Sequence, residues 1–226
     1  MRSYKRYTRR KRLLKHIVVV ALVFILGLVL LRAVSYIAIQ GEIPMINSFN
    51  LFRREADTSF GWNLILVNDD YRIPRNYEVE LTELSNGEKV DSRIYPQLQQ
   101  MFDAARAEEL ELFVREGYRT TQDQKNIMNE RIQKYQDEGY SRWEAKERAE
   151  EYVAEPGTSE HELGIAVDIN ADTSKCSSDA VYTWLANNAY KYGFIKRYPD
   201  DKTEITGINN EPWHYRYVGE DSAIEM

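Results

Sequence analysis

The sequence predicts an α+β domain with a small antiparallel sheet flanked by helices, preceded by a single transmembrane helix. An apolar stretch near the N-terminus, interrupted only once by a charged residue, is long enough to span a bilayer. In the remainder, amphipathic helical patterns are interspersed with short apolar runs typical of strands, and no internal repeat is evident. With 226 residues, 43% of them hydrophobic, the chain can bury the core of one ordinary domain.

The first 40 residues have the features of an export and membrane segment. Residues 1–16 form a basic tail, and 17–39 are apolar apart from Arg32, Ser35 and Tyr36, giving 23 residues where a bilayer core needs about 20. The basic tail indicates a cytoplasmic N-terminus and an external domain. A cleaved signal peptide is the alternative, although its apolar region usually has about 7–15 residues. We therefore expect a single-pass cell-membrane protein with an extracellular domain, or a secreted one.

Charge is distributed unevenly along the chain. Residues 1–40 contain nine of the 30 Lys and Arg residues and no Asp or Glu, which leaves 21 basic against 36 acidic residues in 41–226. A formal charge of −15 on this part repels nucleic-acid phosphates, so we expect no nucleic-acid partner. The single cysteine, Cys176, excludes an internal disulfide.

The exported part divides into a linker and a domain. Residues 40–60 lack clear periodicity and are expected to form a linker, so the predicted domain spans 61–226. In chain order we expect a strand at 63–67, a helix at 93–109, a strand at 110–115, helices at 121–135 and 141–153, a strand at 164–169, a helix at 179–192 and a strand at 213–218.

The first of these elements follow from apolar spacing and capping residues. Residues 63–67 (NLILV) form an apolar run of strand length, and 93–109 repeat apolar residues at helical spacing. Thr120 or Thr121 can cap the helix that follows. Ser141 with Glu144 three residues later forms a capping-box pattern for the next helix.

The later elements follow from alternation and a glycine stop. Residues 164–169 (GIAVDI) alternate in the manner of a strand. Residues 179–192 place apolar side chains on one face, and Gly193 can end that helix. The final apolar and aromatic stretch, 213–218, is typical of a strand.

Two stretches near these last strands contain the residues most suited to chemistry. They are 159–168 (SEHELGIAVD) and 211–216 (EPWHYR), and each holds one of the chain's three histidines. Two imidazoles and one carboxylate, here His161, His214 and Asp168, are a standard ligand set for catalytic zinc, with the fourth position open to water. Ordinary core or surface histidines are the alternative interpretation.

The spacing within the stretches suggests how such a site could form. His161 and Asp168 are seven residues apart, so a turn at Gly164 is needed to bring them together. Glu211 lies three residues before His214, and Pro212 makes a helical placement unfavourable. A turn there would put a carboxylate beside the metal without making it a ligand, the position of a general base.

These stretches resemble the zinc signature S-x-H-x-x-G-x-A-x-D followed by E-P-W-H of the VanY-type D-alanyl-D-alanine carboxypeptidases. That family is related to the VanX dipeptidases and the LdcB-type L,D-carboxypeptidases. Residues 116–120 (EGYRT) with Gln124 are similar to the family's S-G-Y-R-S…Q segment, and 192–195 (YGFI) followed by 197–199 (RYP) also match. Glu116 stands where Ser is commoner. The matches run in order from about residue 63 to residue 219.

The resemblance implies a Zn²⁺ cofactor and a catalytic pair. His161, Asp168 and His214 would be the zinc ligands. Glu211 would act as the catalytic base and then as the acid toward the leaving amine. Arg119 would polarise the scissile carbonyl and stabilise the oxyanion, a role that suits a fixed guanidinium.

The resemblance also implies a substrate. Ser159 and Gln124 are candidates for holding the peptide, with a local cap or turn role as the alternative for each. The implied reaction is D,D-carboxypeptidase hydrolysis of the C-terminal D-Ala from peptidoglycan stem peptides. An L,D-carboxypeptidase acting on tetrapeptides remains an alternative. So does a non-catalytic cell-wall-binding module, which would be expected to lack Glu211, Arg119 or a ligand.

Overall fold

The computed structural model describes residues 24–29 and 53–226 and divides the chain into two units, Met1–Phe52 and Arg53–Met226. Residues 24–29 are helical and exposed. Within the two described ranges, no helix combines the length and the apolar character that a membrane crossing requires. The predicted tail, 1–16, and most of the predicted span, 17–39, lie outside the described residues.

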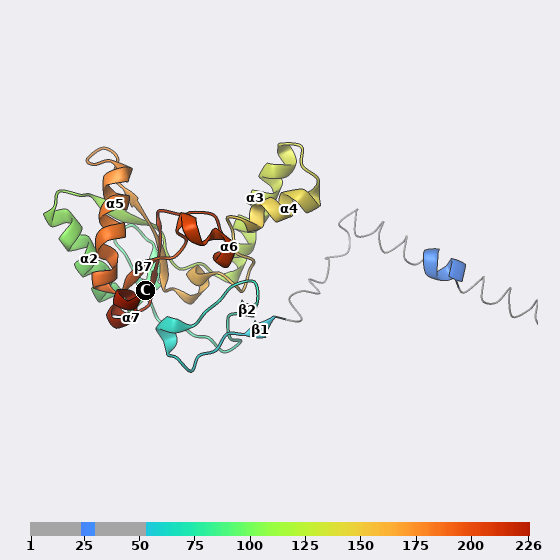
Figure 1. Cartoon of the computed structure of the whole chain (residues 1–226), viewed down its shortest axis with the longest axis horizontal. Coiled ribbons are helices and arrows are strands. Elements are labelled where there is room, and N and C mark those ends of the chain that lie inside the picture. Colours follow the sequence, from blue (N-terminus) through green and yellow to red (C-terminus); the bar gives the residue numbers. More distant parts are fainter. Residues whose placement is uncertain (1–23, 30–52) are drawn as a thin grey trace, which may run out of the picture. The chain divides into compact units, whose positions relative to one another are not determined.

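A four-stranded antiparallel sheet organises the second unit (Figure 1). Its strands run in the order β5 (Leu112–Glu116), β6 (Ala166–Ala171), β8 (His214–Tyr217) and β7 (Phe194–Lys196). The predicted strands at 110–115, 164–169 and 213–218 correspond to β5, β6 and β8. The predicted α+β class is therefore confirmed, with β7 as an additional strand.

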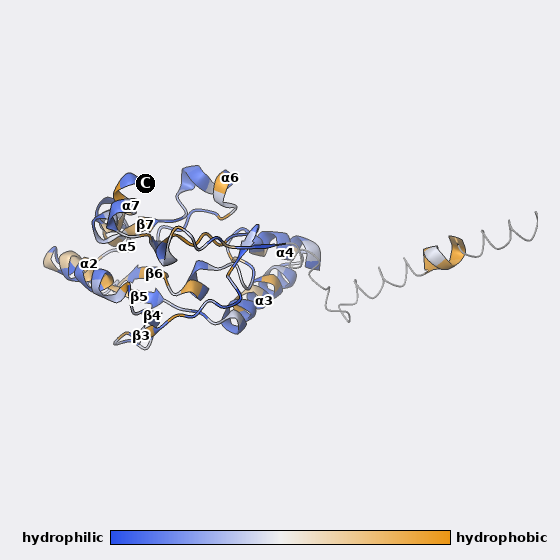
Figure 2. Ribbon diagram, turned by 90° about the horizontal axis from the view of Figure 1, so that it is seen from below, coloured by the Kyte–Doolittle hydropathy of each residue, from blue (hydrophilic) through white to orange (hydrophobic). Residues whose placement is uncertain are grey.

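Two helices pack against one face of this sheet. These are α2 (Tyr95–Ala107) and α5 (Ser178–Asn188), which lie close together in Figures 1 and 2. Their buried side chains join those of the strands in one core cluster. Residues on a strand alternate between faces, so Val167 and Ile169 enter this core while Asp168 points to the opposite face. The predicted helices at 93–109 and 179–192 are thereby confirmed. The second is α5 followed by a 3₁₀ helix, η3 (Ala189–Tyr192), which ends at Gly193 with φ 80°.

A helical hairpin of α3 (Thr121–Asp137) and α4 (Arg142–Glu150) extends beside the sheet (Figure 1). Both helices are predominantly hydrophilic (Figure 2) and share a small apolar cluster of their own. Each begins with a capping box, in which the N-cap side chain and the N3 carboxylate satisfy each other's backbone donors. The N-caps are Thr120, one of the two residues considered for the first helix, and Ser141, the residue predicted for the second.

Two expectations about the start of the domain are corrected. The predicted strand at 63–67 is a 3₁₀ turn, η1 (Trp62–Leu64), followed by an extended segment without a ladder partner. The apolar run fills the core through Ile65 and Val67, and the carbonyl of Ile65 accepts a hydrogen bond from the Arg216 side chain. The domain also begins at Arg53 rather than at residue 61.

The early boundary comes from a short strand inside the expected linker. β1 (Arg54–Glu55) pairs in parallel with β2 (Tyr71–Arg72). A hairpin that the sequence analysis did not predict, β3 (Leu81–Glu83) and β4 (Lys89–Asp91), follows. The shorter helices were also not predicted; they are η2 (Glu160–Leu163), η4 (Asp200–Lys202), α6 (Thr203–Thr206) and α7 (Glu220–Glu225).

Candidate metal centre

The three predicted metal ligands converge on the sheet face opposite the main core. His161 lies in η2, Asp168 in β6 and His214 at the start of β8, where Asp168 and His214 are cross-strand partners. Gly164 follows η2 in the left-handed conformation, φ 74°, and turns the chain into β6. The potential donor atoms of the three side chains lie within 4.8 Å of one another.

Hydrogen bonds select which nitrogen of each imidazole faces the shared site. His161 Nδ1 lies 2.7 Å from the carbonyl oxygen of Gly117. A carbonyl can only accept, so this nitrogen carries the proton and Nε2 is left facing Asp168 Oδ1 at 3.4 Å. In His214 the roles are exchanged, because Nδ1 lies 3.0 Å from Asp168 Oδ1 and Nε2 faces Glu160. The inward donors are therefore Nε2 of His161 and Nδ1 of His214.

The support for His161 depends on the absence of a side chain at position 117. A Cβ on Gly117 would lie 2.2 Å from the carbonyl oxygen of Lys89, a distance that no side chain can tolerate. The backbone N–H of Tyr118 donates to the same Lys89 oxygen at 2.6 Å. Gly117 thus lets β4 and the segment after β5 approach closely enough to fix the carbonyl that holds His161.

The donor set fits a tetrahedral metal ion such as Zn²⁺. Bonds of about 2.0–2.1 Å to nitrogen and oxygen give a tetrahedron with edges of about 3.3 Å, and the two histidine–Asp168 separations are 3.4 and 3.0 Å. Burial opposes charge on His214, but its hydrogen bond to Asp168 and the nearby Glu160 carboxylate raise its pKa to about 9. The metal-free site therefore holds a positive charge between carboxylates, a place that a bound cation can take.

Glu211 lies at the edge of this donor set. Its Oε2 is 3.8 Å from His214 Nδ1, and the side chain is 12% exposed. The loop is fixed by the backbone, because the N–H of Glu211 donates to Tyr198 and its carbonyl accepts from His214. Burial raises the pKa of the Glu211 carboxyl to about 7, which is the range of an effective general base at neutral pH.

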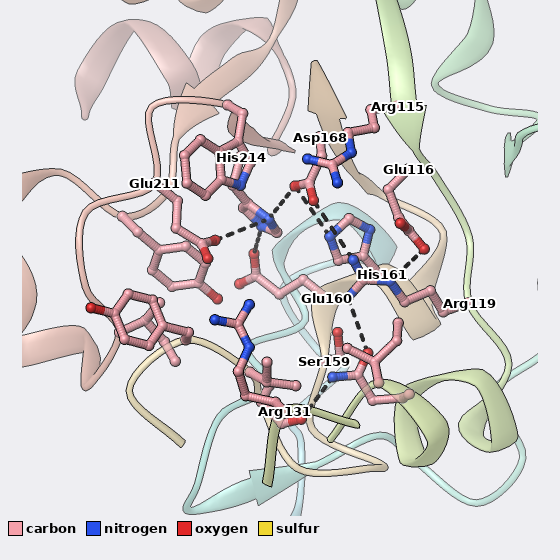
Figure 3. A pocket seen from close by; sticks show the side chains of 18 residues that line it. Arg115, Glu116, Arg119, Arg131, Ser159, Glu160, His161, Asp168, Glu211 and His214 are labelled. Atoms are coloured by element: carbon pink, nitrogen blue, oxygen red, sulfur yellow. Dashed lines mark hydrogen bonds and ion pairs between the residues drawn. The ribbon is translucent and has the colours of Figure 1, made fainter. Parts of the chain in front are cut away.

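Arg119 approaches the donor set from the side opposite Glu211 and the loop that precedes β8 (Figure 3). Its Nη2 lies 3.6 Å from Asp168 Oδ2, and its Nε donates to Glu116 Oε1 at 3.0 Å. Its Nη1 donates to Gln124 Oε1 at 3.2 Å, while the Gln124 amide nitrogen donates to the carbonyl of Ala154 at 2.7 Å. Glu116, which departs from the expected Ser, thus helps to hold Arg119. Gln124 is fully buried with both ends of its amide engaged by protein groups.

Comparison with known families agrees with this geometry. A family model described as VanY, D-alanyl-D-alanine carboxypeptidase, matches residues 87–220, more than half of the chain. The chain belongs to the VanY family. The matched range contains the donor set, Glu211 and Arg119, so the resemblance inferred from the sequence is confirmed.

Individual relatives cover most of this VanY-family chain. A D-alanyl-D-alanine carboxypeptidase of Enterococcus faecalis is 52% identical over 185 residues, which make up 82% of this chain and 69% of the relative. VanYB, solved in complex with D-Ala-D-Ala, is 57% identical and superposes with a TM-score of 0.72 over 73% of this chain and 91% of its own.

Two further solved structures bear on the metal and on the substrate. A mutant of a vancomycin-resistance D,D-pentapeptidase VanY, in complex with Zn(II), is 57% identical, with a TM-score of 0.71 over 73% of this chain and 92% of its own. LdcB, an LD-carboxypeptidase, is 34% identical, with a TM-score of 0.63 over 77% of this chain and 91% of its own.

The donor set of this VanY-family protein opens into a cavity of about 230 Å³ (Figure 3). Ser159, Gln124, Arg119 and Glu211 all line it, so every predicted site residue lies at one cavity. The hairpin of α3 and α4 and the segment after it supply another wall. That wall contains Ile127, Arg131, Tyr152, Val153 and Ala154.

The sequence analysis assigned no role to four residues that also form the site. Glu160 lies behind His214 and contacts Arg197 and Arg216, and the ring of Tyr198 lies 4.8 Å from that of His214. All four fall within or beside the quoted motifs. Their place in the motifs could therefore have marked them as site residues. Their contacts could not be predicted, because they join η2 to residues in or next to β7 and β8, which are distant in the sequence.

Proposed function

We propose that this VanY-family chain is a zinc-dependent D,D-carboxypeptidase that hydrolyses the C-terminal D-Ala from peptidoglycan stem peptides. The observation that carries the proposal is the convergence of two imidazoles, one carboxylate, Glu211 and Arg119 on a single cavity. The names of the family and of the Enterococcus faecalis relative support the enzyme class.

In this proposal the metal is held by His161 through Nε2, His214 through Nδ1 and Asp168 through its carboxylate. A bound Zn²⁺ supplies Lewis-acid activation of water and of the scissile carbonyl. The Zn(II) complex of the related VanY supports this choice of metal.

The chain's own side chains then move the proton and stabilise the charge. Glu211 accepts a proton from the attacking water as the water oxygen bonds to the carbonyl carbon. The Arg119 guanidinium, fixed by Glu116 and Gln124, stabilises the negative charge that develops on the carbonyl oxygen. The C–N bond then breaks, Glu211 returns the proton to the departing amine, and one D-Ala leaves with a peptide shortened by one residue.

Charge in the cavity suits a substrate with a free C-terminus. Arg115 and Arg131 line the cavity, and neither has an ion-pair partner within 4.0 Å among residues 53–226. Figure 3 draws the Arg131 side chain reaching from the α3 wall toward the side where Glu211 lies. The leaving residue must lie near Glu211 to receive its proton, so we assign the carboxylate of that residue to Arg131.

The second candidate function is L,D-carboxypeptidase activity on tetrapeptides, which the similarity to LdcB favours. The D,D assignment is preferred because VanYB, with 57% identity against 34% for LdcB, was solved with D-Ala-D-Ala. The deciding experiment is to incubate the zinc-loaded protein with stem peptides of four and five residues and to identify the products by mass. Loss of one alanine from the pentapeptide alone supports the D,D assignment, loss from the tetrapeptide alone supports the L,D assignment, and no loss from either supports a wall-binding module.

We further propose that residues 17–39 anchor the domain on the outer side of the cell membrane, downstream of the basic tail 1–16. The support is the length of the apolar run and the position of the basic residues. The test is cell fractionation with mass analysis of the mature chain. A membrane-bound chain that retains residues 1–39 and is digested by external protease agrees with the proposal, whereas a released chain lacking them indicates a cleaved signal peptide.

A further inference from the structure

A buried carboxylate lies beside the metal donors, next to the outer nitrogen of the His214 ring. Glu160, next to His161 in η2, is only 2% exposed. A carboxylate so deeply buried requires compensation by hydrogen bonds or opposite charge. Its partners therefore indicate what it does in the fold.

The two oxygens of Glu160 have different partners. Oε1 accepts from Arg197 Nε at 2.7 Å and from Arg216 Nη1 at 2.6 Å. Oε2 accepts no hydrogen bond that meets normal geometry, but it faces His214 Nε2 at 3.6 Å. That imidazole nitrogen is itself buried with no hydrogen-bond partner among the described residues. Glu160 Oε2 and His214 Nε2 are thus two buried polar atoms that face each other without another hydrogen-bond partner among the described residues.

The guanidinium groups that hold Glu160 are fixed from separate parts of the fold. Arg216 is 4% exposed, and its Nη2 donates to the carbonyls of Ile65 at 2.6 Å and Asn63 at 3.2 Å. Arg197 follows β7 and lies over the ring of Tyr198 at 5.1 Å. The carboxylate is thereby restrained by one guanidinium from β8 and one from the residue after β7, which leaves it little freedom to turn away from His214.

We propose that Glu160 is a positioning residue of the metal centre, which accepts the Nε2–H of His214 and so presents the Nδ1 lone pair of that ring to the metal. The inference rests on the proposed zinc site. An imidazole that binds a metal through one nitrogen carries its proton on the other, and a carboxylate acceptor fixes both the tautomer and the ring orientation. The carbonyl of Gly117 fixes the tautomer of His161 in the same way, by accepting its Nδ1–H. The two ligands are then held by two different acceptors, one neutral and one charged.

The test is Glu160→Gln, which keeps the volume of the side chain. The amide oxygen of Gln is expected to turn toward the two guanidiniums, leaving its NH₂ facing His214 Nε2. That arrangement requires a lone pair on Nε2, while metal binding requires one on Nδ1. We expect zinc affinity, measured by competition with a chelator, to fall about 10–100-fold, as for other supporting groups behind metal ligands.

Glu162→Gln is the matched control. Glu162 lies in the same η2 turn and is 5% exposed, but its Oε2 accepts from the backbone N–H groups of Gly157 and Ser159 and contacts no ligand. We expect this variant to keep the zinc affinity of the wild type. A folded Glu160→Gln variant with wild-type zinc affinity would overturn the proposal and leave Glu160 as an ordinary partner of two arginines.

A second measurement on the unmodified protein covers the case in which the variant does not fold. In the zinc-loaded wild type, nitrogen-15 NMR should give His214 as the Nε2–H form, with a slowly exchanging imidazole proton. An Nδ1–H form contradicts the proposal. The proposed function fails separately, because a wild type that binds zinc but releases no D-Ala refutes the reaction and leaves the role of Glu160 intact.

Discussion

Replacing Glu211 with Gln should lower the catalytic rate and raise the stability of the metal-free protein. The amide keeps the shape of the side chain, and the backbone hydrogen bonds that hold the loop are unaffected. The variant lacks the group that accepts and returns the proton, a contribution of about 10²–10⁴-fold in rate. We expect kcat to fall by that factor while zinc remains bound, since Glu211 is not among the donor atoms.

The stability of the metal-free protein should rise in the same variant. Burial raises the pKa of Glu211 from its ordinary value of 4.5 to about 7. Above pH 7 the side chain is ionised in both the folded and the unfolded protein, and the buried carboxylate then lowers the free energy of unfolding. At about 1.36 kcal/mol per pKa unit, the cost is roughly 3 kcal/mol at pH 8 and is absent below pH 4.5. Gln removes it, which should raise the Tm by on the order of 5–10 °C for a domain of this size.

The assays are D-Ala release from a pentapeptide and thermal unfolding of the metal-free protein at pH 8 and pH 5. Glu147→Gln is the control, because Glu147 is exposed on α4 and has no ion pair among the described residues. It should change neither quantity. A Glu211→Gln variant that retains a tenth of wild-type kcat, or whose Tm gain at pH 8 is no larger than at pH 5, refutes the reasoning.

Four further substitutions test the surroundings of the donor set. Arg119→Lys cannot reproduce the three contacts of the guanidinium, so kcat should fall about 10²–10³-fold in steady-state assays, and a loss below tenfold contradicts the oxyanion role. Arg131→Ala should raise KM for a peptide acid but not for the corresponding C-terminal amide. Arg115→Ala should change KM for the two substrates alike. The reverse pattern would move the carboxylate site to Arg115. Gly117→Ala would bring a Cβ within 2.2 Å of the Lys89 carbonyl, so chelator competition should give weaker zinc binding and a melting curve a lower Tm, and an unchanged protein would contradict the close approach.

The sequence was informative where local chemistry determines the structure. Capping residues placed the starts of α3 and α4, because the N-cap and N3 side chains act within one turn. The donor set could be proposed because two histidines and Asp168 occur in motifs with a turn-forming Gly164 between them. The capping residues and the pair His161 and Asp168 each lie within a few positions of one another, whereas His214, 46 residues from Asp168, was added to the set through its own motif.

What the sequence did not give depends on contacts between distant segments. An apolar run such as 63–67 has the same pattern whether it pairs in a sheet or packs in a core as an unpaired extended segment. Glu160 lies 37 residues from Arg197 and 56 from Arg216, so its role becomes visible only when β7 and β8 come together behind His214.

The most direct test of the zinc carboxypeptidase assignment is a stoichiometric titration of the metal-free protein with Zn²⁺, with D-Ala release from a pentapeptide measured at each addition. We expect activity to be absent without zinc, to rise linearly with added zinc and to stop rising at one ion per chain. In Asp168→Asn, which lacks the carboxylate of the three-residue donor set, activity should stay absent. D-Ala release that is unaffected by removal of zinc, or that is retained by Asp168→Asn, would contradict a zinc centre at His161, Asp168 and His214.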